Sequence, residues 1–155
     1  MEKPITAALV AKYFIFKSHK AGKPISNKKL QKLVYYAQAW HLVLRDGKPL
    51  FNDPIEAWVH GPAVRALYGA YKQYGHGNIG DAVQEKDLTG ITKDMEDVLD
   101  QVWEAYGEKY DAEYLEMLSH SEAPWQKARE GIEEAESSSS EISLDEMKKY
   151  YSSLK

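Results

Sequence analysis

A long helical repeat of apolar residues in the first third of the chain constrains its fold more than any other feature. Between residues 26 and 46 apolar side chains recur at steps of three and four, the period of one face of an α-helix. Ser26 or Asn27 can cap the start of this helix, and Asp46-Gly47 can end it. The pattern therefore favours a mainly helical fold. The apolar positions are Leu30, Leu33, Val34, Ala37, Trp40 or His41, and Leu44.

Capping residues and amphipathic stripes mark the other helices. A first helix is expected at about 5–18, and later helices are expected to begin after Thr92, Asp111, Ala123 and Ser143. The predicted fold is mainly α: a single compact domain over residues 1–155, with about six or seven helices and one small β-hairpin. The acidic, serine-rich segment 133–142 is expected to be a flexible loop before the C-terminal helix.

The periodicity changes from strand to helix at Gly61-Pro62. Residues 55–60 alternate between two faces, whereas apolar residues after Pro62 return at helical steps. Proline suits the first position of a helix because its missing N–H needs no partner there. We expect the strand at 55–59 to pair with residues 50–51 and a helix to run from 62 to about 74. The two faces of the strand are Ile55, Ala57 and Val59 on one side and Glu56, Trp58 and His60 on the other.

The composition is that of a globular protein. Of its 155 residues 43% are hydrophobic and 28% are charged. No segment approaches the roughly 18 apolar residues of a membrane span, and the N-terminal residues lack the apolar centre of a signal peptide. Cysteine is absent, which excludes disulfides, thiol nucleophiles and thiolate zinc sites. We therefore expect a cytoplasmic protein with no membrane partner.

Charge is distributed unevenly along the chain. Residues 1–75 hold 12 Lys/Arg and 4 Asp/Glu, whereas residues 76–155 hold 8 Lys/Arg and 20 Asp/Glu. Such a division can indicate a basic surface for nucleic acid or an acidic surface for a basic protein. The alternative is that the two halves pack together and neutralise each other.

The motifs that suggest chemistry are weak. GHGNIG at 75–80 matches a dinucleotide-binding pattern, but it follows a predicted helix and leads into a loop instead of joining a strand to a helix. None of the five histidines has the spacing of a zinc-binding pair. Acidic pairs occur too often by chance here to mark a hydrolytic site. We expect no enzymatic activity, no cofactor and no metal.

A basic patch is a further possibility on the helix at 26–46. Lys28, Lys29 and Lys32, interleaved with Tyr35 and Tyr36, would give the electrostatic pattern of a nucleic-acid-binding surface. They could equally form a solvated helix face over buried tyrosine rings. The acidic second half argues against nucleic acid as a partner, so a nucleic-acid-binding regulator stays an alternative.

One block of the sequence, residues 27–75, resembles a known family. NKKLQKLVYYAQAWHLVLRDGKPLFNDPIEAWVHGPAVRALYGAYKQYG is similar to the signature of the Panacea domain, the SocA-like, phage-associated protein family. Pro124-Trp125 and Ile142…Tyr150-Tyr151 also resemble it, whereas Ala63 stands where the family pattern has valine. The matching positions are Leu30, Gln31, Lys32, Leu33, Tyr35, Tyr36, Trp40, Pro49, Leu50, Ala57, Trp58, Gly61, Pro62 and Tyr68.

The resemblance implies an antitoxin. Members neutralise a toxin encoded beside them, usually by direct protein binding, and the same domain is paired with many unrelated toxins. One branch instead acts as a proteolytic adaptor that delivers its toxin to a protease. The expected partner is therefore a cognate protein toxin, with a protease as the alternative partner, and homo-oligomerisation is left open.

The resemblance also directs attention to the bend at Gly61 and Pro62, which we expect to be a structural corner. The side chains around it are the expected partner-binding surface, although they could instead only hold the fold together. These residues are Lys29, Lys32, Tyr36, Glu56, Trp58, His60 and Arg65.

Overall fold

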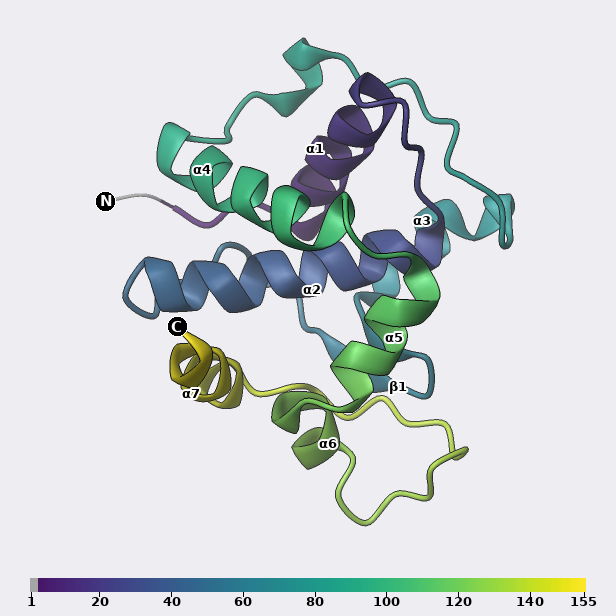
Figure 1. The fold of residues 1–155 in the computed structure, drawn as a ribbon, viewed down its shortest axis with the longest axis vertical. Coiled ribbons are helices and arrows are strands. Elements are labelled where there is room, and N and C mark those ends of the chain that lie inside the picture. The colour runs from purple at the N-terminus through teal and green to yellow at the C-terminus, as the bar shows by residue number, and fades with distance from the viewer. Residues whose placement is uncertain (1–2) are drawn as a thin grey trace.

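The chain folds around one central helix, α2 (Asn27–Leu44). The structure is a computed structural model and describes residues 3–155. Figure 1 shows α2 crossing the middle of the molecule, with α1 (Ala7–Lys20) and α4 (Lys93–Val102) on one side and α6 (Ala123–Ala128) and α7 (Leu144–Leu154) on the other. Helices α7, α4, α1 and α5 (Ala112–His120) all pack against α2.

Helix α2 is buried on almost every side, because neighbours surround it. Gln31 and Lys32 do not belong to the apolar repeat of this helix, yet both are buried, so Lys32 does not form part of a solvated face. The buried amides of α2 are hydrogen-bonded, as buried polar groups usually are. Gln38 donates to the Phe51 carbonyl at 2.6 Å and accepts from the Leu50 N–H at 2.7 Å, which fastens the segment after α2 back onto the helix.

Four of the predicted helix starts are confirmed. Ser26, Thr92, Asp111 and Ser143 each accept a hydrogen bond from the backbone N–H three residues later. Thr6 does the same for α1. These starts depend on residues adjacent in sequence, which is why the sequence alone locates them.

Shorter elements complete the fold. They are α3 (Arg65–Tyr71), the 3₁₀-helices η1 (Lys72–Tyr74) and η2 (Glu85–Leu88), and the π-helix η3 (Trp103–Gly107) that continues α4. A Cβ on Gly107 would lie 2.3 Å from Cε3 of Trp103, so the wide turn at the end of η3 requires glycine. Seven α-helices and one two-stranded sheet in residues 3–155 confirm the predicted fold class.

The predicted strand at 55–59 forms a hairpin with the residues after it instead of the residues before it. Strand β1 (Glu56–Trp58) pairs antiparallel with β2 (Gly61–Ala63), and not with residues 50–51. Phe51 instead forms a parallel bridge with Ile5, and the Asp53 carboxylate accepts from the Ala7 N–H at 3.0 Å. Phe51 and Asp53, which lie in the segment of the predicted hairpin, thus hold the start of α1. This is a contact between segments that are distant in sequence.

Pro62 is part of β2, so the prediction that it opens the helix is wrong. Helix α3 begins three residues later, at Arg65. The side chain of Gln31 accepts the Val64 N–H at 2.8 Å, and this bond keeps residue 64 outside the helix. Cross-strand pairing therefore extends through the proline before the helix can start.

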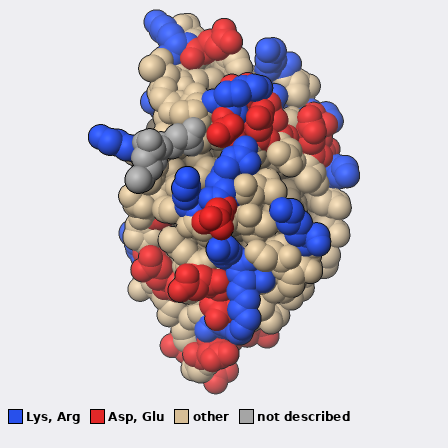
Figure 2. All heavy atoms as spheres, turned by 90° about the vertical axis from the view of Figure 1, so that its left-hand side faces the viewer, with Lys and Arg blue, Asp and Glu red and all other residues tan. Residues whose placement is uncertain are grey.

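The two halves of the chain neutralise each other in part. Lys17 pairs with Asp100 at 3.3 Å, and Lys28 pairs with Glu113 at 3.1 Å. On the face shown in Figure 2, acidic and basic side chains lie next to one another instead of forming regions of one sign. Within residues 3–155 no helix is long and apolar enough to cross a lipid bilayer.

Candidate functional site

The hairpin β1–β2 forms a sharp corner at the surface. Trp58 and Gly61 face each other across the two-residue loop Val59-His60. Gly61 has φ +107°, a backbone conformation that residues with a side chain rarely adopt. A Cβ at this position would also lie 2.6 Å from Cε of Lys32. The glycine therefore allows the hairpin backbone to lie directly on the Lys32 side chain.

Three of the predicted site residues form one cluster on this corner. Glu56 Oε1 accepts from the Trp58 indole N–H and from the Arg65 guanidinium, both at 2.8 Å. The Arg65 guanidinium lies 5.4 Å from the centre of the Trp58 ring, within cation–π range. These hydrogen bonds hold the pKa of Glu56 below its usual value, despite the opposing effect of partial burial. The cluster presents an aromatic ring and a charged pair in one fixed arrangement.

Tyr68 of α3 extends the aromatic surface of the cluster. Its ring meets that of Trp58 edge-to-face at 5.2 Å, and 47% of the tyrosine is exposed. His60 is exposed at the tip of the hairpin. A hollow of about 430 Å³ lies beside them, lined by Trp58, Val59, His60, Arg65 and Ser137–Ser139. We name Glu56, Trp58, His60, Arg65 and Tyr68 the corner surface.

Lys32 lies beneath this surface. Its residue is 2% exposed, and its ammonium donates to the Pro62 carbonyl at the long distance of 3.3 Å. Burial lowers the pKa of Lys32 to about 7, because desolvation disfavours the charged form. Glu116 and Glu113 oppose this shift, whereas Lys28 adds to it. The predicted site residue is therefore a buried amine and not an exposed cation.

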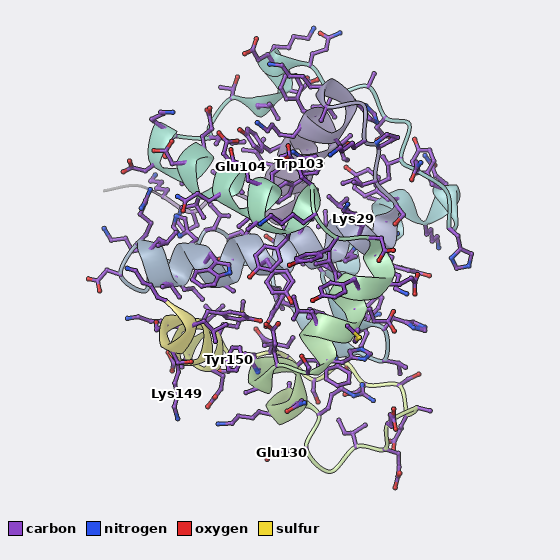
Figure 3. The ribbon with its side chains drawn as sticks, in the orientation of Figure 1. Lys29, Trp103, Glu104, Glu130, Lys149 and Tyr150 are labelled. Atoms are coloured by element: carbon purple, nitrogen blue, oxygen red, sulfur yellow. The ribbon has the colours of Figure 1, made fainter. Side chains whose placement is uncertain are left out.

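Lys29 and Tyr36 lie away from the corner surface. The Lys29 ammonium donates to the Gly107 carbonyl at 2.6 Å, and Figure 3 shows Lys29 on the side of α2 near the connection between α4 and α5. This half-buried amine has a lowered pKa, mainly through desolvation. Tyr36 has no exposed surface. Contact between Tyr36 and a partner would require the core to open, so its position fits a structural role.

Tyr36 belongs to a buried network that the sequence did not reveal. The hydroxyls of Tyr36 and Tyr151 donate to Oε1 of Glu122 at 2.7 and 2.9 Å, and the hydroxyl of Tyr35 lies 2.9 Å from that of Tyr151. Burial raises the pKa of Glu122, although both tyrosine bonds favour its ionised form. The network links α2, the residue before α6, and α7. The only sequence signal is the pair Tyr35-Tyr36 on α2.

Arg129, also absent from the predicted site, holds the acidic loop against the hairpin. The guanidinium is buried and donates to the Ala57 carbonyl at 2.8 Å and to the Glu133 carbonyl at 3.1 Å. The far end of the loop is held as well, because the Ala57 N–H donates to Ser140 at 2.8 Å. Flexibility of residues 133–142 stays a prediction, but contacts to β1 fix where the loop crosses the molecule. An arginine two residues before GIEEAESSSS was the available signal.

The three lysines of the suggested nucleic-acid patch do not share an exposed face. Lys28 pairs with Glu113 and Glu116, Lys29 reaches Gly107, and Lys32 is buried. Gly75, the first residue of GHGNIG, ends η1, and the segment continues as a loop. Among residues 3–155 no group of three or more histidine or acidic side chains is arranged to hold a metal ion.

Comparison with known proteins gives two consistent matches. The antitoxin SocA-like, Panacea domain family matches residues 30–126, a range that holds the corner surface, Lys32 and Glu122. Antitoxin SocA from Caulobacter vibrioides (strain NA1000 / CB15N) is 32% identical over 131 residues, which cover 78% of this chain and 69% of that protein. No solved structure gives a significant match. The chain therefore belongs to the antitoxin SocA-like, Panacea domain family.

Proposed function

We propose that this protein is the antitoxin of a toxin–antitoxin pair, and that it neutralises a cognate protein toxin by binding it directly through the corner surface. The observation that supports this most is the fixed cluster of Glu56, Trp58 and Arg65 on an exposed bend. The family supports an antitoxin role, and such binding needs no catalytic activity.

The composition of the corner surface suits protein recognition. Tryptophan, tyrosine and arginine are the residues that contribute most often to binding energy at protein interfaces. Here Trp58, Arg65 and Tyr68 contact one another before any partner arrives. Because these side chains are already ordered, less conformational entropy is lost on binding. A stable complex would bury about 800 Å² on each partner, so we infer that surface next to the corner contributes as well.

The serine-rich loop provides the additional area. Ser137–Ser139 line the hollow beside Trp58 and Arg65, and Arg129 holds the loop in that place. Glu133, Glu134 and Glu136 are exposed on the same loop. We infer that the toxin contacts both the hairpin and this loop. Lys29 and Tyr36 act from inside the fold by keeping α2 in position.

Binding can be tested with the product of the neighbouring open reading frame. It should arrest growth when expressed alone, and co-expression of the wild-type protein should restore growth. The double variant Trp58→Ala/Arg65→Glu should fail to restore growth and should not co-purify with the toxin. Lys149→Glu, an exposed change on α7, is the matched control and should rescue like wild type. A double variant that still rescues fully would contradict the proposed surface, and a harmless neighbour would contradict the proposed function.

The toxin half-life, measured with the same pair of proteins, distinguishes neutralisation by binding from delivery to a protease. We expect the toxin to keep its half-life in cells that contain the antitoxin and to be inactive in the purified complex. A shorter toxin half-life, restored when host ATP-dependent proteases are deleted, would identify a proteolytic adaptor instead.

A further inference from the structure

A second hollow lies on the other side of the hairpin from the serine-rich loop. Its volume is about 380 Å³, within the range of small-ligand sites and far larger than one water molecule. It is enclosed by the first turns of α2, the hairpin, α3 with the residues after it, and the start of α5. The lining includes Lys32, Trp58, His60, Tyr68, Lys72 and His76. We name it the lysine pocket.

Lys32 is the most buried cation of the pocket. An ammonium group has three N–H donors, and the bond to Pro62 at 3.3 Å uses one of them poorly. Buried polar groups normally find partners, and leaving a buried donor without one costs free energy. The amine therefore retains donor capacity in the wall of the pocket. An acceptor entering the pocket would complete its hydrogen bonds.

The rim of the pocket carries cationic and aromatic groups. Within residues 3–155 Lys72 has no acidic side chain in ion-pair distance, and it is exposed, as are His60 and His76. Trp58 and Tyr68 supply apolar walls next to these groups. The pocket thus combines positive charge with rings that can cover an aliphatic stem.

The carboxylates near the pocket are already paired. Glu113 and Glu116 both bind the ammonium of Lys28, and these ion pairs lower the pKa of Glu116 below its usual value despite the opposing effect of burial. They therefore leave Lys32 and Lys72 without a carboxylate in hydrogen-bond contact. Lys28, Lys32 and Lys72 line the pocket with one acidic side chain, Glu113, so basic groups outnumber acidic ones there.

We propose that the lysine pocket binds a carboxylate side chain of the toxin, with Lys32 as the buried donor and Lys72 as the rim cation. This proposal rests on the proposed function, since it names the chemistry by which the toxin engages the corner. A glutamate or aspartate fits because its carboxylate reaches the amine while its stem packs on Trp58 and Tyr68.

The first test uses the antitoxin alone, so that it does not depend on the toxin. The isotopically labelled protein is titrated with acetyl-Gly-Phe-Glu-Gly amide, with the same peptide carrying glutamine, and with inorganic phosphate. The glutamate peptide should shift the backbone resonances of Gly61 and Ala63 and bind at least fivefold more tightly than the glutamine peptide. Equal binding of the two peptides, or shifts with phosphate only, would overturn the proposal.

The second test uses the toxin complex and two pocket variants. Lys32→Met shortens the side chain by one atom and removes its donors, and Lys72→Glu reverses the exposed charge. We expect the toxin dissociation constant to rise at least tenfold for Lys32→Met and about fivefold for Lys72→Glu. Lys149→Glu should leave it unchanged. Circular dichroism confirms that each variant is folded.

The outcomes separate the pocket from the function. If the toxin binds wild type, Lys32→Met and Lys72→Glu with equal affinity, the pocket is empty in the complex and the proposal fails, while the antitoxin function stands. If the toxin does not bind wild type at all, the proposed function fails, and the peptide titration still decides whether the pocket accepts a carboxylate.

Discussion

The protein buries two ionisable side chains in opposite ways. Glu122 accepts hydrogen bonds from two tyrosine hydroxyls that come from different helices, α2 and α7. Within the part of the chain that the structure describes, Lys32 has one hydrogen bond, which is long and goes to a backbone carbonyl under the hairpin. Burial shifts the pKa of both groups toward the neutral form. Their surroundings differ because Glu122 has two short side-chain hydrogen bonds and Lys32 has one long bond to the backbone.

This difference distinguishes a part of the fold from a part of the site. A satisfied buried network stabilises one arrangement of its helices, and breaking it leaves several polar groups without partners. An incompletely satisfied buried cation weakens the fold, and its retention is easier to understand if it binds something. The network around Glu122 is therefore expected to set stability, and Lys32 to set recognition.

Removal of Glu122 is expected to give the largest effect. Glu122→Ala leaves the hydroxyls of Tyr36 and Tyr151 without their acceptor and opens a cavity, so the free energy of unfolding should fall by about 3–4 kcal/mol. Urea denaturation followed by circular dichroism measures it. Glu130→Ala is the control, because Glu130 is exposed just beyond α6 (Figure 3), and it should change stability by less than about 0.5 kcal/mol. If the two variants lost similar free energies of unfolding, the network around Glu122 would not set the stability of the fold.

Lys32→Met should raise the free energy of unfolding, whereas Glu122→Ala should lower it. Methionine fills the buried space without an amine to desolvate, so the variant should be more stable than wild type by about 3 kcal/mol at pH 7. Between pH 7 and 10.5 the unfolded chain binds a proton at Lys32 that the folded protein does not, so wild-type stability rises with pH.

The advantage of the variant should therefore shrink by about 2 kcal/mol between pH 7 and pH 9. The charged neighbours Glu116 and Lys28 keep their charge across this interval, because their ion pair lowers the pKa of Glu116 and raises the pKa of Lys28. Urea denaturation at the two pH values measures the change. A variant less stable than wild type at pH 7 would show that the Pro62 bond satisfies the amine, and the comparison with Glu122 would then be wrong.

Gly61→Ala tests whether the corner depends on Lys32. The new Cβ would approach the lysine stem at 2.6 Å on a backbone with φ +107°, so we expect a loss of about 2 kcal/mol. Lys32→Ala in the same chain removes the clash but not the backbone strain. The double variant should therefore lose less than the two single losses added together, as a double-mutant cycle would show. Strict additivity would contradict the contact.

The smallest effect on stability is expected on the corner surface itself. Arg65→Ala breaks an ion pair whose arginine is largely exposed, and such pairs contribute about 0–1 kcal/mol. Its toxin affinity should nevertheless fall about tenfold, because Arg65 lies over the Trp58 ring and belongs to the proposed binding surface. Thermal unfolding measures the stability of the variant, and titration of the same sample with the toxin measures its affinity. A stability loss without an affinity loss would assign Arg65 to the fold.

The sequence predicted features that depend on neighbouring residues. Helix starts at Ser26, Thr92, Asp111 and Ser143 follow from short-range hydrogen bonds, and all four are confirmed. The prediction that residues 50–51 pair with the strand at 55–59 was wrong, because this segment binds the start of α1 instead. Asp53 accepts the N–H of Ala7, which lies 46 positions earlier in the chain. Pairing between such distant segments leaves no periodic trace.

The same distinction explains which parts of the candidate site could be predicted from the sequence and which could not. Alternation in 55–60 predicted that Glu56 and Trp58 share a face, and their hydrogen bond agrees with this prediction. The burial of Tyr36 was one of the two alternatives, whereas the burial of Lys32 was not foreseen, because a helix covered on almost every side has no solvent face to carry its polar residues. Glu122 and Arg129 lie in ordinary acidic segments, and only the fold brings them to Tyr36 and Ala57.

The placement of α7 has a consequence for how the protein is made. Tyr35 and Tyr151 meet across 116 positions of sequence, so the central helix stays open on one side until the C-terminal helix has left the ribosome. An incomplete nascent chain exposes apolar surface and is open to quality-control proteases. A chain whose translation stops before α7 is therefore expected not to complete this fold.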